Sequence, residues 1–166
     1  MDKLLQLDQG KSGWSVDRSI EFDERSYLSA DQNSPSASDS KVWLFTLSQW
    51  QLARHKLDLT GIHCGLLLDA DADLSDIAED LPRFGVVVID FPHFNDGRGF
   101  SLGAQLREHY QFRGEMRAAG YLLVDQLNYL LRCGFDSFSF RNNVDPETAV
   151  SALSDFSDSY QPSVAV

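Results

Sequence analysis

The segment GVVVIDFPHFNDGRG, residues 85–99, decides the fold of this chain. Residues 86–89 are apolar and β-branched, which is typical of a strand buried in a parallel sheet. A polar loop containing His93 and Asp96 follows this strand, and a helical pattern then runs from Phe100 to Tyr110. These elements predict one β–α unit, in which a ligand site is expected where the strand ends.

Four further β–α units are predicted around this one, because short apolar runs alternate with amphipathic stretches. In the fourth helix, Leu123, Leu127 and Leu130 are expected to share one apolar face. Asp145 is expected to cap the last helix. The predicted strands are Val42–Leu47, Gly65–Asp69, Val86–Ile89, Glu115–Ala119 and Ser137–Phe140, and the predicted helices are Gln49–Leu57, Leu74–Leu81, Phe100–Tyr110, Leu122–Arg132 and Pro146–Phe156.

Five alternating units predict an α/β fold with a parallel or mostly parallel sheet in a three-layer sandwich. They are too few for a closed eight-stranded barrel, and a partial barrel is the alternative. Lys3–Leu7 and Trp14–Phe22 alternate in polarity and predict an N-terminal β-hairpin or edge strands. Residues 29–40 have the composition of a linker or loop. We therefore divide the chain into an N-terminal part, 1–40, and one α/β domain, 41–166.

The acidic composition excludes some classes of function. The chain of 166 residues has a formal net charge of −11, which argues against nucleic-acid binding and favours basic protein partners. Its two cysteines, Cys64 and Cys133, have no metal-ligand spacing, so no metal site is predicted. The N-terminus lacks a signal-peptide pattern and no apolar run reaches membrane-spanning length. We expect a cytoplasmic protein that does not enter a membrane.

Arginines are the candidate ligand-binding residues, because every lysine lies at or before Lys56. The planar guanidinium group suits paired oxygens of a carboxylate or another oxyanion. We predict an anion site formed by Arg98 with Gly97 and Gly99 at a helix start, and by Arg117 and Arg141. The alternative is structural: these arginines pair with Glu108, Glu115, Asp125 and Asp136.

His93 is the candidate general acid or base, because its reference pKa lies near neutrality. Asp96 is expected either to orient His93 or to cap the following helix. Asp125 and Gln126 are polar groups on an apolar helix and need partners. We expect Asp125 to pair with Arg117 or Arg98, an arrangement that suits both bracing and ligand orientation.

Two specific binding motifs, for a dinucleotide and for calcium, are not matched by the sequence. The glycines of residues 97–103 do not have the dinucleotide-binding spacing, and no other cofactor motif is recognisable. The run Asp69-Ala70-Asp71-Ala72-Asp73 lacks the glycine and glutamate of a calcium-binding EF-hand. Its Asp-x-Asp opening fits an aspartate-dependent phosphotransferase with Asp69 as nucleophile. No lysine follows to stabilise the phosphoryl group, so a solvated acidic turn is the favoured interpretation.

Several sequence blocks resemble a bacterial family, domain of unknown function (DUF) family 934. The similarity covers roughly residues 65–162 and departs from the family pattern at Leu102 and Tyr121. The blocks are FPHFNDGRGFS (91–101), LRE (106–108), GEMRAAG (114–120), DQLNYLLRCGFDSF (125–138) and Tyr160-Gln161-Pro162. The resemblance implies a small cytoplasmic protein encoded beside assimilatory sulfite reductase and labelled as an oxidoreductase of sulfite reduction.

Two functional hypotheses follow from the residues and the resemblance together. The first is an accessory factor or small enzyme of sulfur assimilation that binds an oxyanion through its arginines. The second is a non-catalytic partner that docks through its acidic surface on a redox enzyme such as sulfite reductase. The phosphotransferase is the least favoured reading, and the sequence leaves open whether the protein is catalytic.

Overall fold

The computed structural model describes residues 5–10, 13–17, 42–55 and 63–154. Its elements follow the predicted alternation of strands and helices. In chain order they are β1 (Leu5–Gly10), β2 (Gly13–Asp17), β3 (Trp43–Thr46), α1 (Leu47–Ala53), β4 (Cys64–Asp69), η2 (Ser75–Arg83), β5 (Phe84–Phe91), α2 (Arg98–Glu108), β6 (Glu115–Gly120), η3 (Val124–Gln126), α3 (Leu127–Arg132), β7 (Ser137–Phe140) and α4 (Pro146–Ser154).

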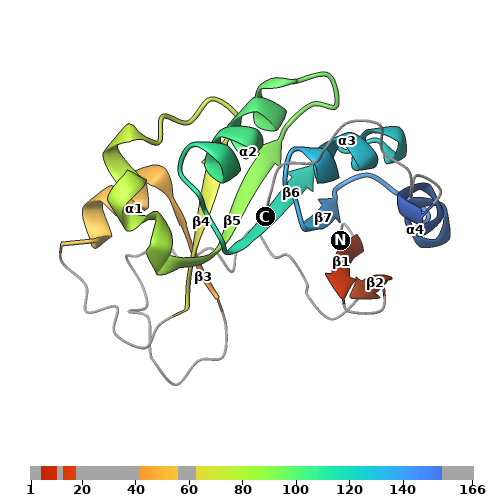
Figure 1. Ribbon diagram of the computed structural model, residues 1–166, viewed down its shortest axis with the longest axis horizontal. Helices are drawn as coiled ribbons and strands as arrows, with labels where there is room; N and C mark the ends of the chain where they lie inside the picture. The colour runs from red at the N-terminus through yellow and green to blue at the C-terminus, as the bar shows by residue number, and fades with distance from the viewer. Residues whose placement is uncertain (1–4, 11–12, 18–41, 56–62, 155–166) are drawn as a thin grey trace.

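The strands form one open sheet in the order β2-β1-β7-β6-β5-β4-β3 (Figure 1). Strands β3 to β7 are parallel to one another, which confirms the predicted parallel α/β fold. Strands β1 and β2 form the predicted N-terminal hairpin, and β1 pairs antiparallel with β7, with Leu5 opposite Phe140. Residues 18–22 of the second predicted strand lie outside the described residues.

The described helices lie on one face of the sheet. Because β3 to β7 follow one another in order, each right-handed crossover advances in the same direction and places its helix on the same face. The main core cluster contains residues from every α-helix and from η2, whereas the buried cluster on the other face contains strand residues alone. The expectation of helices on both faces, in three layers, therefore does not match the described residues.

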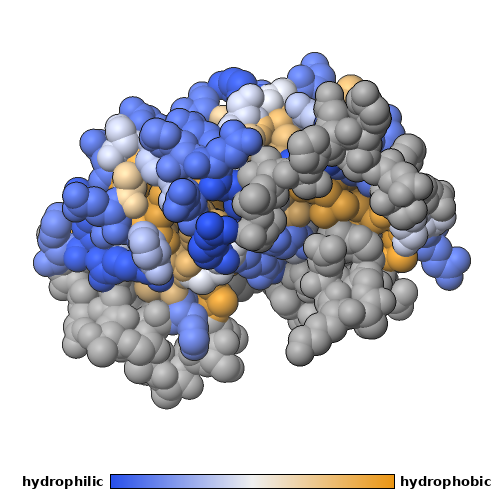
Figure 2. All heavy atoms as spheres, in the orientation of Figure 1, coloured by the Kyte–Doolittle hydropathy of each residue, from blue (hydrophilic) through white to orange (hydrophobic). Residues whose placement is uncertain are grey.

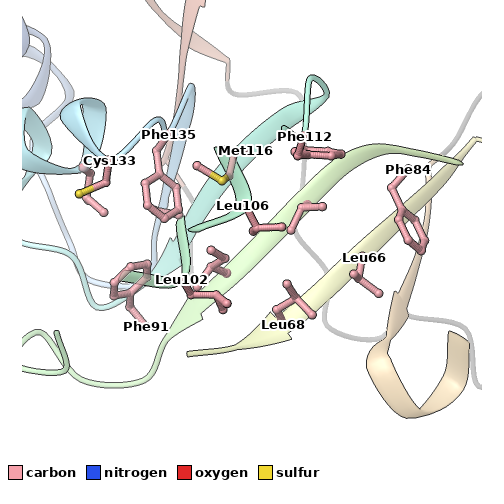
Figure 3. Packing of buried hydrophobic residues seen from close by; sticks show 14 of the residues in the cluster. Leu66, Leu68, Phe84, Phe91, Leu102, Leu106, Phe112, Met116, Cys133 and Phe135 are labelled. Atoms are coloured by element: carbon pink, nitrogen blue, oxygen red, sulfur yellow. The ribbon is translucent and has the colours of Figure 1, made fainter. Parts of the chain in front are cut away.

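The part of the core that positions the site lies between the strands and α2. Hydrophilic residues cover most of the described surface seen in Figure 2, while Figure 3 shows Leu66 and Leu68 of β4 and Phe91 of β5 on the side of the sheet that meets Leu102 and Leu106 of α2. Burying such side chains stabilises a fold by roughly 1.5–3 kcal/mol each. This packing fixes where α2 begins, and therefore the loop before it.

Two predicted helices differ in form. The predicted Leu74–Leu81 helix is a 3₁₀ helix, Ser75–Arg83, that includes Pro82. The predicted Leu122–Arg132 helix is divided into the short η3 and α3, so Leu123 lies outside α3 and is 37% exposed while Leu127 and Leu130 are buried. No helix in the described part of the chain has the length and apolarity needed to cross a membrane.

Candidate functional site

The site lies at the carboxyl-terminal edge of the parallel strands, where the loops after β4, β5 and β6 are joined by side-chain bonds. Arg98, the first residue of α2, reaches Asp71 in the loop after β4, with Nη1 at 2.8 Å from Oδ2. Gln126 donates from Nε2 to the backbone oxygen of Phe94 at 2.7 Å. These contacts bring together loops that are far apart in the sequence, as the predicted topology required.

Arg98 is paired with two carboxylates. Its Nη2 lies 2.6 Å from Oδ2 of Asp96, and its Nε lies 3.0 Å from Oδ1. Oδ1 of Asp96 also accepts the backbone N–H of Arg98 at 3.1 Å. The bonds from Arg98 lower the pKa of Asp96 to about 2. Arg98 therefore links the loops after β4 and β5, and its guanidinium group is already engaged.

His93 is exposed, and its backbone oxygen accepts the N–H of Asp96 at 3.1 Å. Both carboxylate oxygens of Asp96 bind Arg98 at the start of α2. Of the two roles expected for Asp96, the structure therefore favours fixing the start of the helix over orienting the imidazole ring.

The two glycines beside Arg98 differ in their surroundings. A Cβ atom at Gly99 would lie 2.5 Å from the ring of Phe91, so this glycine allows α2 to pack closely on β5. A Cβ atom at Gly97 would meet nothing within 4 Å. Close helix packing accounts for Gly99, whereas the structure gives Gly97 no packing role.

Arg117 is separated from Arg98. Arg117 is buried in β6, where its Nη2 lies 2.6 Å from Oε1 of Glu115 and its Nε donates to Oγ of Ser137 at 3.1 Å. Its neighbours in register are Val88 and Ser137, which places it within the sheet and not at the carboxyl-terminal edge. The predicted grouping of Arg117 with Arg98 is therefore wrong.

Arg141 follows β7, and its Nη2 lies 3.3 Å from Oδ1 of Asp90 at the end of β5. Asp125 is exposed on η3. Its expected pairing with Arg117 or Arg98 is wrong, because those two guanidinium groups bind Glu115 in one case and Asp71 with Asp96 in the other. The structural alternative, in which the arginines pair with carboxylates of the fold, holds for Arg117 and Glu115.

Gly120 allows the backbones of β5 and β6 to approach each other closely at this edge. Its φ is +122°, and a Cβ atom there would lie 2.3 Å from the backbone oxygen of Phe91. That oxygen accepts the N–H of Tyr121 at 2.9 Å. Only glycine adopts this backbone conformation at such close approach without strain, so Gly120 sets the direction of the loop that carries Tyr121.

Sequence reasoning missed a group of exposed apolar side chains at the same edge. We call Phe94, Tyr121, Leu123 and Tyr129 the edge patch; they are 55%, 48%, 37% and 53% exposed. Only two other large hydrophobic residues, Val42 and Leu52, are comparably exposed in the described part of the chain. The available signal was the placement of Phe94 and Tyr121 in loops that directly follow buried strands.

The fold and the edge define a singly wound, open α/β protein whose loops are joined by arginine–carboxylate pairs. The chain belongs to the family described as "Bacterial protein of unknown function (DUF934)", whose model matches residues 65–166. No curated protein and no solved structure matches the chain. Within the described ranges, no group of three or more His, Cys, Asp or Glu side chains is arranged to hold a metal ion.

Proposed function

We propose that this protein is a non-catalytic accessory protein that docks on a basic partner enzyme, with sulfite reductase as the first partner to test. The observation that carries this proposal is the pairing of the arginines. Arg98, Arg117 and Arg141 each have a carboxylate partner. The edge of the sheet thus offers carboxylates and aromatic side chains to a partner, and the formal net charge of −11 favours a basic one. The connection to sulfur assimilation rests on the sequence resemblance.

Oxyanion binding is less well supported by this geometry. A sulfite or phosphate ion at Arg98 would have to displace Asp71 or Asp96 from a guanidinium group that holds both. Asp96 binds Arg98 through both carboxylate oxygens, Oδ1 to Nε and Oδ2 to Nη2, which is the stronger, two-bond form of the pair. An incoming anion would also meet the remaining carboxylate at close range, where like charges repel.

The test is a calorimetric titration of purified sulfite reductase with the full chain, carried out at low and at high salt. We expect a 1:1 complex whose dissociation constant rises steeply with ionic strength, because charge steers the association. The absorbance spectrum of the purified protein and a thermal shift with sulfite are measured in parallel. Absence of a complex would overturn sulfite reductase as the partner, whereas a bound flavin or metal chromophore, or strong stabilisation by sulfite, would each overturn the non-catalytic docking role.

A further inference from the structure

We infer, on the basis of the proposed function, that the edge patch is the surface on which the partner docks, and that the partner contributes an apolar segment bearing arginine or lysine. The first step is the clustering of exposed apolar side chains. Four of the six exposed large hydrophobic residues in the described ranges lie in the loop after β5, the loop after β6 and α3. Aromatic side chains gathered at one place on a surface are typical of interfaces.

The second step is that contacts with neighbouring residues anchor three of the four members of the patch. Gln126 accepts the N–H of Leu123 on Oε1 at 3.2 Å while its Nε2 binds the backbone oxygen of Phe94. The ring of Tyr129 packs on Phe100 at a centroid distance of 5.0 Å, and Phe100 packs on the buried Phe91. These contacts hold the backbones of Phe94 and Leu123 and the ring of Tyr129 in place before binding, which lowers the entropic cost of association.

The third step is the charge around the patch. The loops at residues 69–73, 92–98 and 121–126 contain five aspartates and one arginine. That arginine, Arg98, is already bound to Asp71 and Asp96. Two arginines outside these loops also lie nearby: Arg141 pairs with Asp90 near the end of β5, and Arg132 lies over the ring of Tyr129, 5.9 Å from its centroid. The three loops themselves carry an excess of carboxylates. Aromatic faces bordered by carboxylates attract guanidinium and ammonium groups through cation–π and ionic contacts. The chemistry of the edge therefore favours a cationic group.

The same charge argues against a second copy of this chain as the occupant. A two-fold dimer through the edge patch would bring the identical acidic loops of both copies together. Like charges facing one another across an interface cost several kcal/mol. A basic, partly apolar segment avoids this repulsion and covers the exposed rings of Phe94, Tyr121 and Tyr129.

Two pairs of variants test the inference. Phe94→Ser with Tyr129→Ser removes apolar contact in the edge patch, and Leu52→Ser is its control because Leu52 is 66% exposed on α1. Asp125→Lys reverses charge beside the patch, and Glu79→Lys makes the same change at an exposed position of η2. Each variant is first checked for an unchanged thermal midpoint, so that a loss of binding is not a loss of folding.

Two probes are titrated: purified sulfite reductase, and a peptide of alternating arginine and leucine, with a glutamate–leucine peptide as its control. We expect the patch variants to raise the dissociation constant of each cationic probe at least tenfold, and the control variants to change it less than twofold. Sulfite reductase binding that is equally strong for patch and control variants overturns this inference and leaves the proposed function standing.

Patch-dependent binding of the arginine peptide alone supports the inference and overturns sulfite reductase as the partner. Binding of neither probe overturns both proposals. Sedimentation of the protein alone tests whether a second copy of this chain occupies the patch. A dimer that is lost in the double variant Phe94→Ser/Tyr129→Ser would show that it does, and would overturn the inference.

Discussion

Nη2 of Arg107 lies 2.5 Å from Oδ2 of Asp136, and the Arg107 side chain is 1% exposed. The same guanidinium group donates to the backbone oxygens of Phe112, Gly114 and Gly134 at 2.7–2.9 Å. The carboxylate of Asp136 also accepts the N–H of Met116 at 2.8 Å. One buried side chain thus joins α2 to the segments that precede β6 and β7.

Arg107→Met should lower the free energy of unfolding by roughly 3–5 kcal/mol, because it removes the cationic partner of Asp136 and the guanidinium donor of three carbonyl oxygens. Urea denaturation followed by circular dichroism measures the change. Arg113→Met is the matched control at an exposed position, with an expected change of less than about 0.5 kcal/mol. Equal effects of the two substitutions would show that the buried network contributes little.

Gly120→Ala should destabilise the protein by about 2 kcal/mol or more, because the new Cβ combines a positive φ with a clash against the backbone of Phe91. Gly97→Ala makes the same chemical change in open space. Chemical denaturation should therefore show a clearly lower free energy of unfolding for Gly120→Ala than for Gly97→Ala. A Gly120→Ala protein as stable as Gly97→Ala would contradict the close approach of β5 and β6.

The Arg98–Asp96 pair should persist at neutral pH and be lost only in acid. The folded-state pKa of Asp96, about 2, lies below the ordinary value of 3.8. A lowered carboxyl pKa means that the stabilisation is fully present above about pH 4 and disappears as the pH falls through 2. NMR titration of the Asp96 carboxyl carbon measures this directly. In Arg98→Gln the pKa should return toward 3.8, and an unchanged value would rule out Arg98 as its cause.

Leu106→Ala should cost roughly 2–5 kcal/mol in the free energy of unfolding, because Leu106 is completely buried between α2 and the sheet. Leu52→Ala removes the same atoms from an exposed position on α1 and should change stability by less than about 0.5 kcal/mol. Guanidinium denaturation of both variants tests whether α2 is packed as in Figure 3. Similar losses for the two would be inconsistent with that packing.

The strands could be predicted from local sequence patterns: β4 and β5 are largely apolar runs, and β7 alternates serine with phenylalanine. Ser137–Phe140 is reproduced residue for residue, and Asp145 caps α4 as predicted, with Oδ2 accepting the N–H of Thr148 at 2.9 Å. The face on which the helices pack could not be predicted, because it depends on the order of strands in the sheet. That order is a long-range property that local periodicity does not contain.

The candidate site could be predicted only in its position. The sequence indicated the carboxyl-terminal edge, but not which of several nearby carboxylates each arginine binds. Glu115 lies two residues from Arg117 along β6 and pairs with it on the same face, a contact fixed by strand geometry. The spacing of Leu123 predicts a place on a helix face, but the 3₁₀ turn at Val124–Gln126 leaves it at the surface.

The pairing of β1 with β7 has a consequence for folding on the ribosome. The parallel strands β3 to β7 can add to the growing sheet in the order in which they are synthesised, since each pairs with the one before it. The hairpin is synthesised before these strands, yet β1 can pair with β7 only after Phe138 and Phe140 have been synthesised. A nascent chain stalled before residue 137 would therefore carry β3 to β6 together with a hairpin that still lacks its partner strand, and the docking of β1 would have to follow the synthesis of β7.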